Sequence, residues 1–150
     1  MIALGDCPLC RPPGADLLWR NGQLRVVRVD DGLYPGYIRV IWHDHVAEMT
    51  ELQDAARDEM MRTVWRVEQV QRDILQPHKV NLAQFGNMVP HLHWHIIPRW
   101  RDDPHFPDAV WAPVAVRSPS ELESWATRKM HIENILPGFH SALVQALSQA

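Results

Sequence analysis

Between Pro90 and Arg99 the sequence alternates histidines with apolar residues, and this alternation constrains the fold more than any other feature of the chain. The segment reads Pro-His-Leu-His-Trp-His-Ile-Ile-Pro-Arg. Successive side chains of a β-strand point to opposite faces of a sheet. A strand over residues 91–99 therefore places three histidines and Ile97 on one face. The other face carries the apolar residues Leu92, Trp94 and Ile96, which suit a core.

The histidine face has no evident packing role, because imidazole offers no advantage there over valine or threonine. Histidine accounts for 9 of the 150 residues, so three at alternate positions of one strand are improbable by chance. Such a row suits a metal site, or a nucleophile flanked by groups that bind phosphate and move protons. One metal ion does not readily take all three, since they diverge at about 6.6–6.8 Å per step along the strand. The alternative is that the three histidines face solvent on an edge strand and have no chemical role.

The composition indicates one folded domain, with 46% hydrophobic and 22% charged residues. The net charge of −3 argues against a broad basic face for nucleic acid. No apolar run approaches the roughly 18 residues that a membrane span needs. Residues 1–6 also lack the features of a secretory signal. We therefore expect a soluble cytoplasmic protein that binds neither nucleic acid nor membrane.

The remaining pattern predicts strands and helices in one α+β domain. Asn21-Gly22 predicts a hairpin turn. The expected strands are residues 17–20, 23–29, 37–42 and 79–85. Thr50 and Gln53 have the spacing of a capping box, so we expect a long helix from Thr50 to Pro77. A second helix should begin at Ser118-Pro119 and end near Asn134, before a break at Pro137-Gly138 and a final helix over 139–150. The core then spans about 7–100, with a helical extension over about 118–150.

The segment 91–97 matches, at every position, the signature of the histidine triad (HIT) superfamily of nucleotide hydrolases and transferases, which alternates three histidines with apolar residues. The resemblance extends to Asn81 on the preceding strand, to Gly86, and to the stretch from Tyr37 to His45. It covers roughly Cys7 to Arg99. It implies an antiparallel sheet of about five strands with one long helix packed on it and C-terminal helices. It also implies a homodimer.

The resemblance implies that His93 attacks the α-phosphorus of a nucleotide, forming a nucleotidyl-histidine that water then cleaves. An imidazole with a pKa near 6.5 is largely neutral at pH 7 and can act in this way. His95 would donate to phosphate oxygens or protonate the leaving group, and His91 would align the site. Asn81, Gly86 and Asn87 are the expected phosphate-binding residues. Asn87 and Met88 stand where the family usually has glutamine and a hydroxyl residue, so a hydroxyl contact to phosphate is lost.

Two acidic residues, Asp30 and Asp31, precede a loop that resembles the family's nucleotide-binding edge. Either carboxylate could hold ribose hydroxyls, or both belong to a solvated turn. The charged residues after the histidine strand, Arg99, Arg101, Asp102 and Asp103, could reach a polyphosphate tail, although we expect a charged surface loop.

The resemblance is to the bacterial diadenosine tetraphosphate hydrolase-like HIT proteins. We therefore expect a hydrolase that cleaves a dinucleoside polyphosphate or adenosine phosphoramidate at the α-phosphorus. A nucleotidylyltransferase is an alternative, but that branch usually has glutamine in place of His95. A zinc-stabilised nucleotide-binding module with little catalysis is the alternative from another class of protein.

Cys7 and Cys10 form a Cys-x-x-Cys pair with several interpretations. Pro12-Pro13-Gly14 argues against a thioredoxin-like redox pair, and disulfides are rare in a reducing cytoplasm. A structural zinc site needs two more ligands. Some histidine triad proteins carry such a site, and the resemblance implies His45 and His91 as the further ligands. His43 lies in the same turn and could replace His45, and free thiols are the metal-free alternative.

Overall fold

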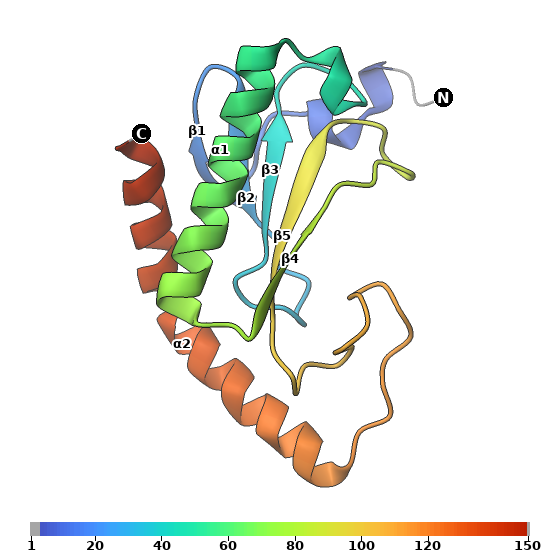
Figure 1. Ribbon diagram of the computed structural model, residues 1–150, viewed down its shortest axis with the longest axis vertical. Coiled ribbons are helices and arrows are strands. Elements are labelled where there is room, and N and C mark those ends of the chain that lie inside the picture. Colours follow the sequence, from blue (N-terminus) through green and yellow to red (C-terminus); the bar gives the residue numbers. More distant parts are fainter. Residues whose placement is uncertain (1–3, 150) are drawn as a thin grey trace.

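The computed structural model describes residues 4–149, which form a five-stranded antiparallel sheet and two long helices (Figure 1). The strands lie in the order β1-β2-β3-β5-β4. They are β1 (Leu17–Arg20), β2 (Leu24–Arg28), β3 (Ile38–Trp42), β4 (Lys79–Ala83) and β5 (His93–Arg99). The helices are α1 (Asp54–Val70), which continues into a π-helical turn η4 (Gln71–Leu75), and α2 (Pro119–Ser148). Short 3₁₀ turns are η1 (Leu4–Asp6), η2 (Pro8–Cys10) and η3 (Met49–Glu51). The predicted α+β class is confirmed.

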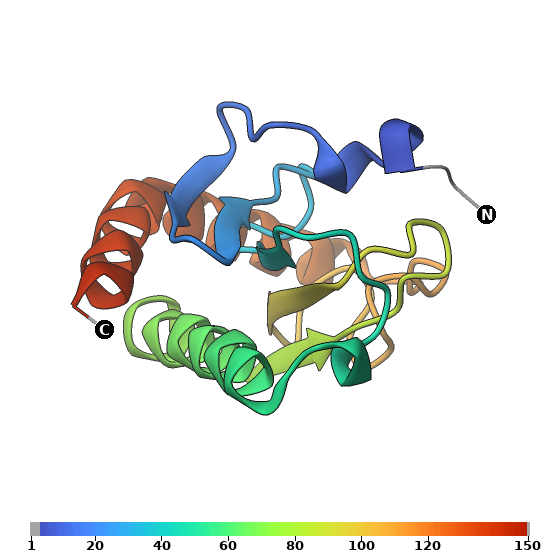
Figure 2. The same cartoon turned by 90° about the horizontal axis from the view of Figure 1, so that it is seen from above.

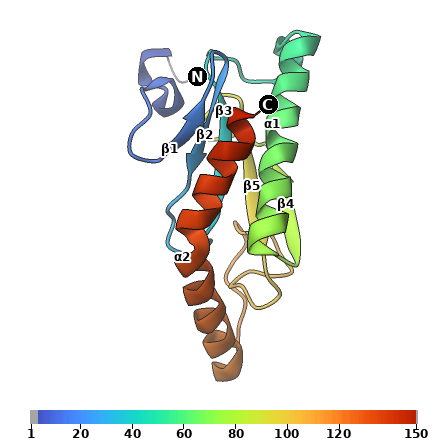
Figure 3. The same ribbon diagram turned by 90° about the vertical axis from the view of Figure 1, so that its left-hand side faces the viewer.

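Both helices cover the same face of the sheet (Figures 2 and 3). The core between them includes Leu92, Ile96 and the half-buried Trp94, so the predicted apolar face is confirmed. The opposite face of β3 and β5 is left uncovered by helices. There Arg39 lies opposite His95 and Ile41 lies opposite His93 in the antiparallel register. The fold thus separates an apolar face for packing from a face available for chemistry.

The start of α1 differs from the sequence prediction. The capping box is formed by Glu48 and Glu51 around η3, and α1 begins only at Asp54. The Glu51 carboxylate accepts the backbone amides of Ala47 and Glu48 at 3.3 and 3.2 Å. The predicted Thr50–Gln53 capping box is therefore wrong. Glu48 and Glu51 form the box two residues earlier, and the Gln53 side chain makes no capping hydrogen bond.

The C-terminal region is one helix, so the predicted break at Pro137-Gly138 is wrong. α2 runs through Pro137 from Pro119 to Ser148, and its axis changes direction part-way along (Figure 1). Proline inside a helix costs about 3 kcal/mol, but apolar side chains on both sides of it are buried in the core: Ile132, Phe139, Leu143 and Leu147. Each such burial contributes about 1.5–3 kcal/mol, which outweighs the cost. No helix among residues 4–149 is long and apolar enough to cross a membrane.

A buried ion pair joins the last residue of β5 to the segment after it, where the sequence had suggested a charged surface loop. Arg99 and Asp103 are 1% and 0% exposed. Arg99 Nε donates to Asp103 Oδ2 at 2.7 Å, and Nη2 donates to Oδ1 at 3.0 Å. The same carboxylate accepts the hydroxyl of Tyr34 at 3.1 Å. The surface-loop prediction was wrong for this pair, which fastens the segment after β5 to the sheet.

The buried pair gives a testable stability and pH dependence. Replacing Asp103 with asparagine leaves the Arg99 charge buried and unpaired, so we expect a loss of about 3–5 kcal/mol in the free energy of unfolding at pH 7. Burial raises the pKa of Asp103, but hydrogen bonds from Arg99 and backbone amides outweigh it and hold the pKa below its ordinary value. The carboxylate therefore stabilises the fold above about pH 3.9, and this contribution is lost as the pH falls further, through the lower native pKa.

Denaturant unfolding between pH 3 and 7 measures this effect. The difference between wild type and Asp103→Asn should shrink below about pH 4. Asp58→Asn is the control, since the Asp58 side chain is 70% exposed, and it should change stability by less than about 0.5 kcal/mol. A difference between wild type and Asp103→Asn that stays constant with pH would contradict the assignment.

Candidate active site

The strand β5 presents His93 and His95 side by side on the uncovered face of the sheet. Their ring centroids are 4.8 Å apart, and both side chains are largely buried. Both border a cavity of about 540 Å³. Its lining comes from five separate parts of the chain: Pro8, Leu9, Arg39, Phe85, Gly86, Asn87, Met88, Val89, His93, His95 and Trp111. The cavity is large enough for part of a nucleotide.

The hydrogen bond of His93 fixes which of its ring nitrogens is free. Nδ1 lies 2.5 Å from the carbonyl oxygen of His91. A carbonyl can only accept a hydrogen bond, so Nδ1 carries the proton and Nε2 keeps its lone pair. Burial, together with the charge of Arg39, lowers the pKa of His93 below its ordinary value. His93 is therefore a neutral imidazole with a nucleophilic nitrogen on the side away from the backbone.

His95 has the opposite arrangement. Its Nδ1 is hydrogen-bonded to the hydroxyl of the buried Tyr37 and lies 3.4 Å from Nε of Arg39. The guanidinium can only donate, so Nδ1 accepts and the proton lies on Nε2. Burial, followed by the effects of His93 and Arg39, lowers the pKa of His95 to about 3. His95 is therefore a neutral hydrogen-bond donor beside the unprotonated Nε2 of His93.

The loop after β4 and the segment after β5 form the outer walls of the cavity. Gly86 has a φ of 78°, a left-handed conformation that favours glycine. The rings of Phe85 and Trp111 meet edge to face at 4.8 Å, and Trp111 also lies 5.3 Å from the ring of His95. Both aromatic side chains are about half exposed. They supply an aromatic surface next to the histidines.

Three of the predicted substrate-binding residues do not line this cavity. The side-chain oxygen of Asn81 accepts a hydrogen bond from Arg99 at 2.8 Å, so Asn81 serves the buried ion-pair network. Asp31 accepts the amides of Leu33 and Tyr34, each at 2.9 Å, which caps a turn. Asp30 is exposed and lies 3.2 Å from Arg28. Gly86 and Asn87, by contrast, do line the cavity.

His91 is not part of the strand, so the expectation that three histidines share one strand face was wrong. β5 begins at His93, and the His91 amide donates to the carbonyl of Val89 in a tight turn at 2.8 Å. The turn sends the imidazole toward the N-terminal segment. Its Nε2 donates to the carbonyl of Trp42 at 2.6 Å, which leaves the Nδ1 lone pair facing the two cysteines.

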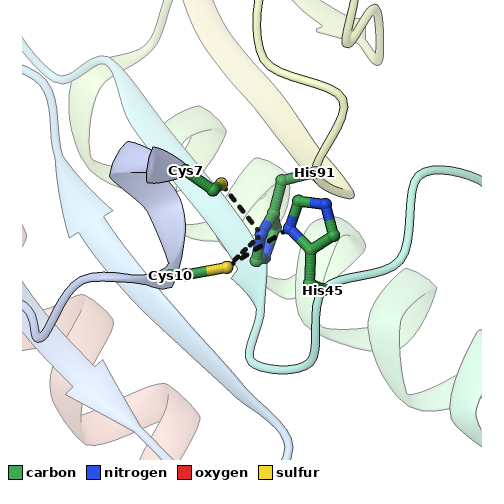
Figure 4. A group of neighbouring side chains, drawn as sticks. All are labelled: Cys7, Cys10, His45 and His91. Carbon is green, nitrogen blue, oxygen red and sulfur yellow. Dashed lines mark hydrogen bonds between the residues drawn. The ribbon is translucent and has the colours of Figure 1, made fainter. Parts of the chain in front are cut away.

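Four of the predicted metal ligands come together around this imidazole (Figure 4). The ligand atoms of Cys7, Cys10, His45 and His91 all lie within 4.8 Å of one another. Cys10 Sγ is 3.2 Å from Nδ1 of His45 and 3.5 Å from Nδ1 of His91, and Cys7 Sγ is 3.6 Å from the latter. Zinc bonds of about 2.3 Å to sulfur and 2.0–2.1 Å to nitrogen give a sulfur–nitrogen edge of about 3.6 Å in a tetrahedron. The cluster can hold a metal ion, and its donors fit zinc; His45, and not His43, belongs to it.

The metal cluster and the histidine cavity share a segment of chain. Pro8 and Leu9 lie between the two cysteines and form part of the cavity wall. Arg25 on β2 also holds this turn, since its Nη2 donates to the carbonyl of Leu9 at 2.7 Å. A metal ion bound by the cysteines would therefore fix one wall of the cavity.

Comparison with known proteins identifies the family. The HIT domain family matches residues 14–102, which is more than half of the chain. The chain belongs to the HIT domain family. This HIT protein is 30% identical over 78 residues to an AP-4-A phosphorylase of Mycobacterium tuberculosis, with 48% of this chain and 40% of that protein aligned. The alignment thus spans less than half the length of that relative.

Solved structures confirm the HIT fold. A histidine triad protein of Bradyrhizobium japonicum superposes with a TM-score of 0.60 and 23% identity, over 81% of this chain and 91% of the other. A histidine triad protein of Marinobacter aquaeolei VT8 gives a TM-score of 0.60 and 24% identity, over 81% and 92%. At these identities the likeness concerns the fold alone.

Several cavity residues were missed by sequence reasoning: Pro8, Leu9, Arg39, Phe85 and Trp111. Arg39 had a detectable signal, since it is the one charged residue between apolar neighbours in strand 38–42. Its position on the face opposite Ile38 and Val40 follows from alternation. Trp111 had no comparable signal, because its contact with His95 depends on the path of a long irregular segment.

Proposed function

We propose that this HIT protein hydrolyses nucleotide phosphoanhydrides or phosphoramidates at the α-phosphorus, with His93 as the nucleophile. The main support is the pair of neighbouring imidazoles with opposite tautomers. One offers a lone pair on Nε2 and its neighbour offers an N–H on Nε2, and both border a cavity. Nucleophilic attack on a phosphoryl group requires such a base next to a donor that binds the developing negative charge. The Mycobacterium relative named AP-4-A phosphorylase supports nucleotide processing.

In the first step, His93 Nε2 forms a bond to the α-phosphorus while the bond from phosphorus to the leaving group breaks. The leaving group departs with its electron pair, as a phosphate anion from a phosphoanhydride, or as an amine that takes a proton from solvent from a phosphoramidate. The Nε2–H of His95 donates to a phosphoryl oxygen, and backbone amides of the loop 86–89 are the further donors. Because the His91 carbonyl holds Nδ1–H of His93, it also stabilises the positive charge that develops on the ring.

In the second step, water attacks the nucleotidyl phosphorus and the Nε2–P bond breaks. The electron pair returns to Nε2 of His93, and the proton of water passes to solvent. From diadenosine tetraphosphate the two steps release ATP and then AMP. Phe85 and Trp111, both about half exposed, are the aromatic side chains beside His95.

We also propose that the ion held by Cys7, Cys10, His45 and His91 is zinc. A closed set of four protein ligands leaves no position for water, so the ion would serve a structural role. The bond from His91 to the Trp42 carbonyl orients the imidazole, as is usual for metal-bound histidines. The ion would hold the Cys7–Cys10 turn against the segments that follow β3 and precede β5, and it would take no part in the phosphoryl steps.

A phosphorylase is the second candidate, because the Mycobacterium relative carries that name. Inorganic phosphate would then replace water in the second step, and the products from diadenosine tetraphosphate would be ATP and ADP. The residue at the third triad position favours water as the acceptor in the second step. The resemblance associates glutamine at that position with transfer, and this chain has His95 there. The resemblance also implies a homodimer. This stays a prediction, and the molecular mass of the protein in solution tests it.

Product analysis and trapping test the proposal together. Purified protein is incubated with diadenosine tetraphosphate in ¹⁸O-water, with and without inorganic phosphate. We expect AMP carrying ¹⁸O in both cases, and an adenylyl adduct on His93 when the reaction is quenched with acid-free denaturant and analysed by mass spectrometry. ADP that appears only with phosphate would favour the phosphorylase. An adduct on a residue other than His93 would overturn the mechanism. The absence of any adduct, with the substrate left uncleaved, would do so as well.

A further inference from the structure

The cavity beside the histidines carries an unbalanced positive charge. Of the residues that line it, Arg39 alone is permanently charged, and no aspartate or glutamate occurs among them. A cavity with aromatic and apolar walls and one fixed cation fits an aromatic ligand that carries more than one anionic group.

The guanidinium of Arg39 has little to hold it in place within the protein. Its Nε lies 3.4 Å from Nδ1 of His95, and its central carbon lies 5.7 Å from the centre of the Tyr37 ring. Among residues 4–149 no carboxylate lies within 4.0 Å of it, although seven other ion pairs occur there. Its two terminal nitrogens donate no hydrogen bond to the described chain. A half-buried guanidinium without a counterion is costly unless a ligand supplies the anion.

The reacting phosphoryl group does not need Arg39 as its main partner. The proposed donors to it are His95, whose ring centroid lies 4.8 Å from that of His93, and the amides of the loop 86–89, which lines the same cavity. A phosphoramidate brings only that one phosphoryl charge, because its leaving group is an amine. A phosphoanhydride brings a second phosphate next to the first, and the cavity lining offers no other fixed positive charge for it.

On the basis of the proposed function, we propose that Arg39 binds the second phosphate of the substrate. The forked guanidinium can donate two hydrogen bonds to one phosphate. Arg39 thereby selects phosphoanhydrides, such as dinucleoside polyphosphates, over phosphoramidates. It acts on substrate specificity and does not replace His95 as the donor at the α-phosphoryl group.

The test compares kcat/KM for diadenosine tetraphosphate and adenosine phosphoramidate in wild type and Arg39→Gln. A lost charge-assisted hydrogen bond to phosphate corresponds to about a 10- to 100-fold effect. We expect the anhydride to lose about 10- to 100-fold more than the phosphoramidate. Arg39→Lys keeps the positive charge but loses the paired donors of the guanidinium, so it should recover part of the preference for the anhydride. The matched control is Arg62→Gln on α1, whose side chain is 62% exposed on the other side of the sheet.

Binding of AMP and ADP to the same proteins tests the inference without turnover. Wild type should bind ADP more tightly than AMP, and Arg39→Gln should lose about tenfold or more of that preference. An ADP-to-AMP affinity ratio that is the same in both proteins would overturn the role of Arg39. Equal losses of kcat/KM for the anhydride and the phosphoramidate would also overturn the role of Arg39. That result would not contradict the proposed hydrolase activity. If wild type cleaves neither substrate, the proposed function fails, and the binding ratio still decides the role of Arg39.

Discussion

Replacing His93 with asparagine is expected to lower kcat for diadenosine tetraphosphate by at least about three orders of magnitude. The asparagine amide can still donate to the His91 carbonyl, which His93 Nδ1 now contacts at 2.5 Å. The lone pair of its amide nitrogen is delocalised into the carbonyl group and does not attack phosphorus, so the covalent step is lost. Steady-state release of AMP measures the effect, and thermal unfolding checks that the fold is intact.

A matched histidine provides the control for this substitution. His131 is exposed on α2, away from the cavity, so His131→Asn should keep wild-type turnover. Binding of a nucleotide product separates the enzyme from a simple binding module. The His93→Asn enzyme should bind AMP with nearly unchanged affinity while turnover disappears. If wild type shows no turnover that depends on His93, the protein is a nucleotide-binding module.

The alternation of the histidine strand predicted the two faces of β5, because the pleat is a local property of the chain. Leu92 and Ile96 are fully buried in the core, and His93 and His95 share the opposite face. The same rule failed for His91, since alternation does not reveal where a strand begins. The turn at His91 is set by contacts with Trp42 and the cysteines, which lie far away in the sequence.

Non-local contacts explain the other differences between prediction and structure. Charged residues are usually exposed, so the sequence suggested a surface loop at Arg99 and Asp103. Their burial depends on Tyr34, Asn81 and backbone amides that saturate their hydrogen bonds. Pro137 likewise indicated a helix end, but the core contacts of Phe139 and Leu143 keep α2 helical.

The metal ligands show what a family resemblance adds to local patterns. The spacing of Cys7 and Cys10 indicates a pair of ligands, yet no rule of spacing identifies partners that lie 35 and 81 residues further along. The resemblance implied His45 and His91, and the structure brings all four together. For Arg39 the resemblance gave no such help, since its importance depends on the absence of a counterion in a cavity built from five segments.

The second large effect is expected at the metal cluster. Replacing His45 with asparagine should reduce bound zinc from about one ion per chain to a small fraction, because a structural site needs four ligands. The cluster ties the Cys7–Cys10 turn to the segments that follow β3 and precede β5, so loss of the ion removes part of the folding free energy. A loss of at least about 3 kcal/mol would lower Tm by roughly 6–12 °C in a domain of this size. Metal content of the purified protein and thermal unfolding with and without a chelator measure both effects.

His43 is a matched control for this prediction, since it lies in the same turn but outside the cluster. The His43→Asn protein should keep zinc and the wild-type Tm, whereas Cys10→Ser should behave like His45→Asn. Chelation of wild type should reproduce the lower Tm, and chelation of His45→Asn should change little further. Because Pro8 and Leu9 form a wall of the cavity, loss of the ion should also weaken AMP binding. Equal zinc content in wild type and His45→Asn, or loss of zinc from His43→Asn, would show that the ion is held by other ligands.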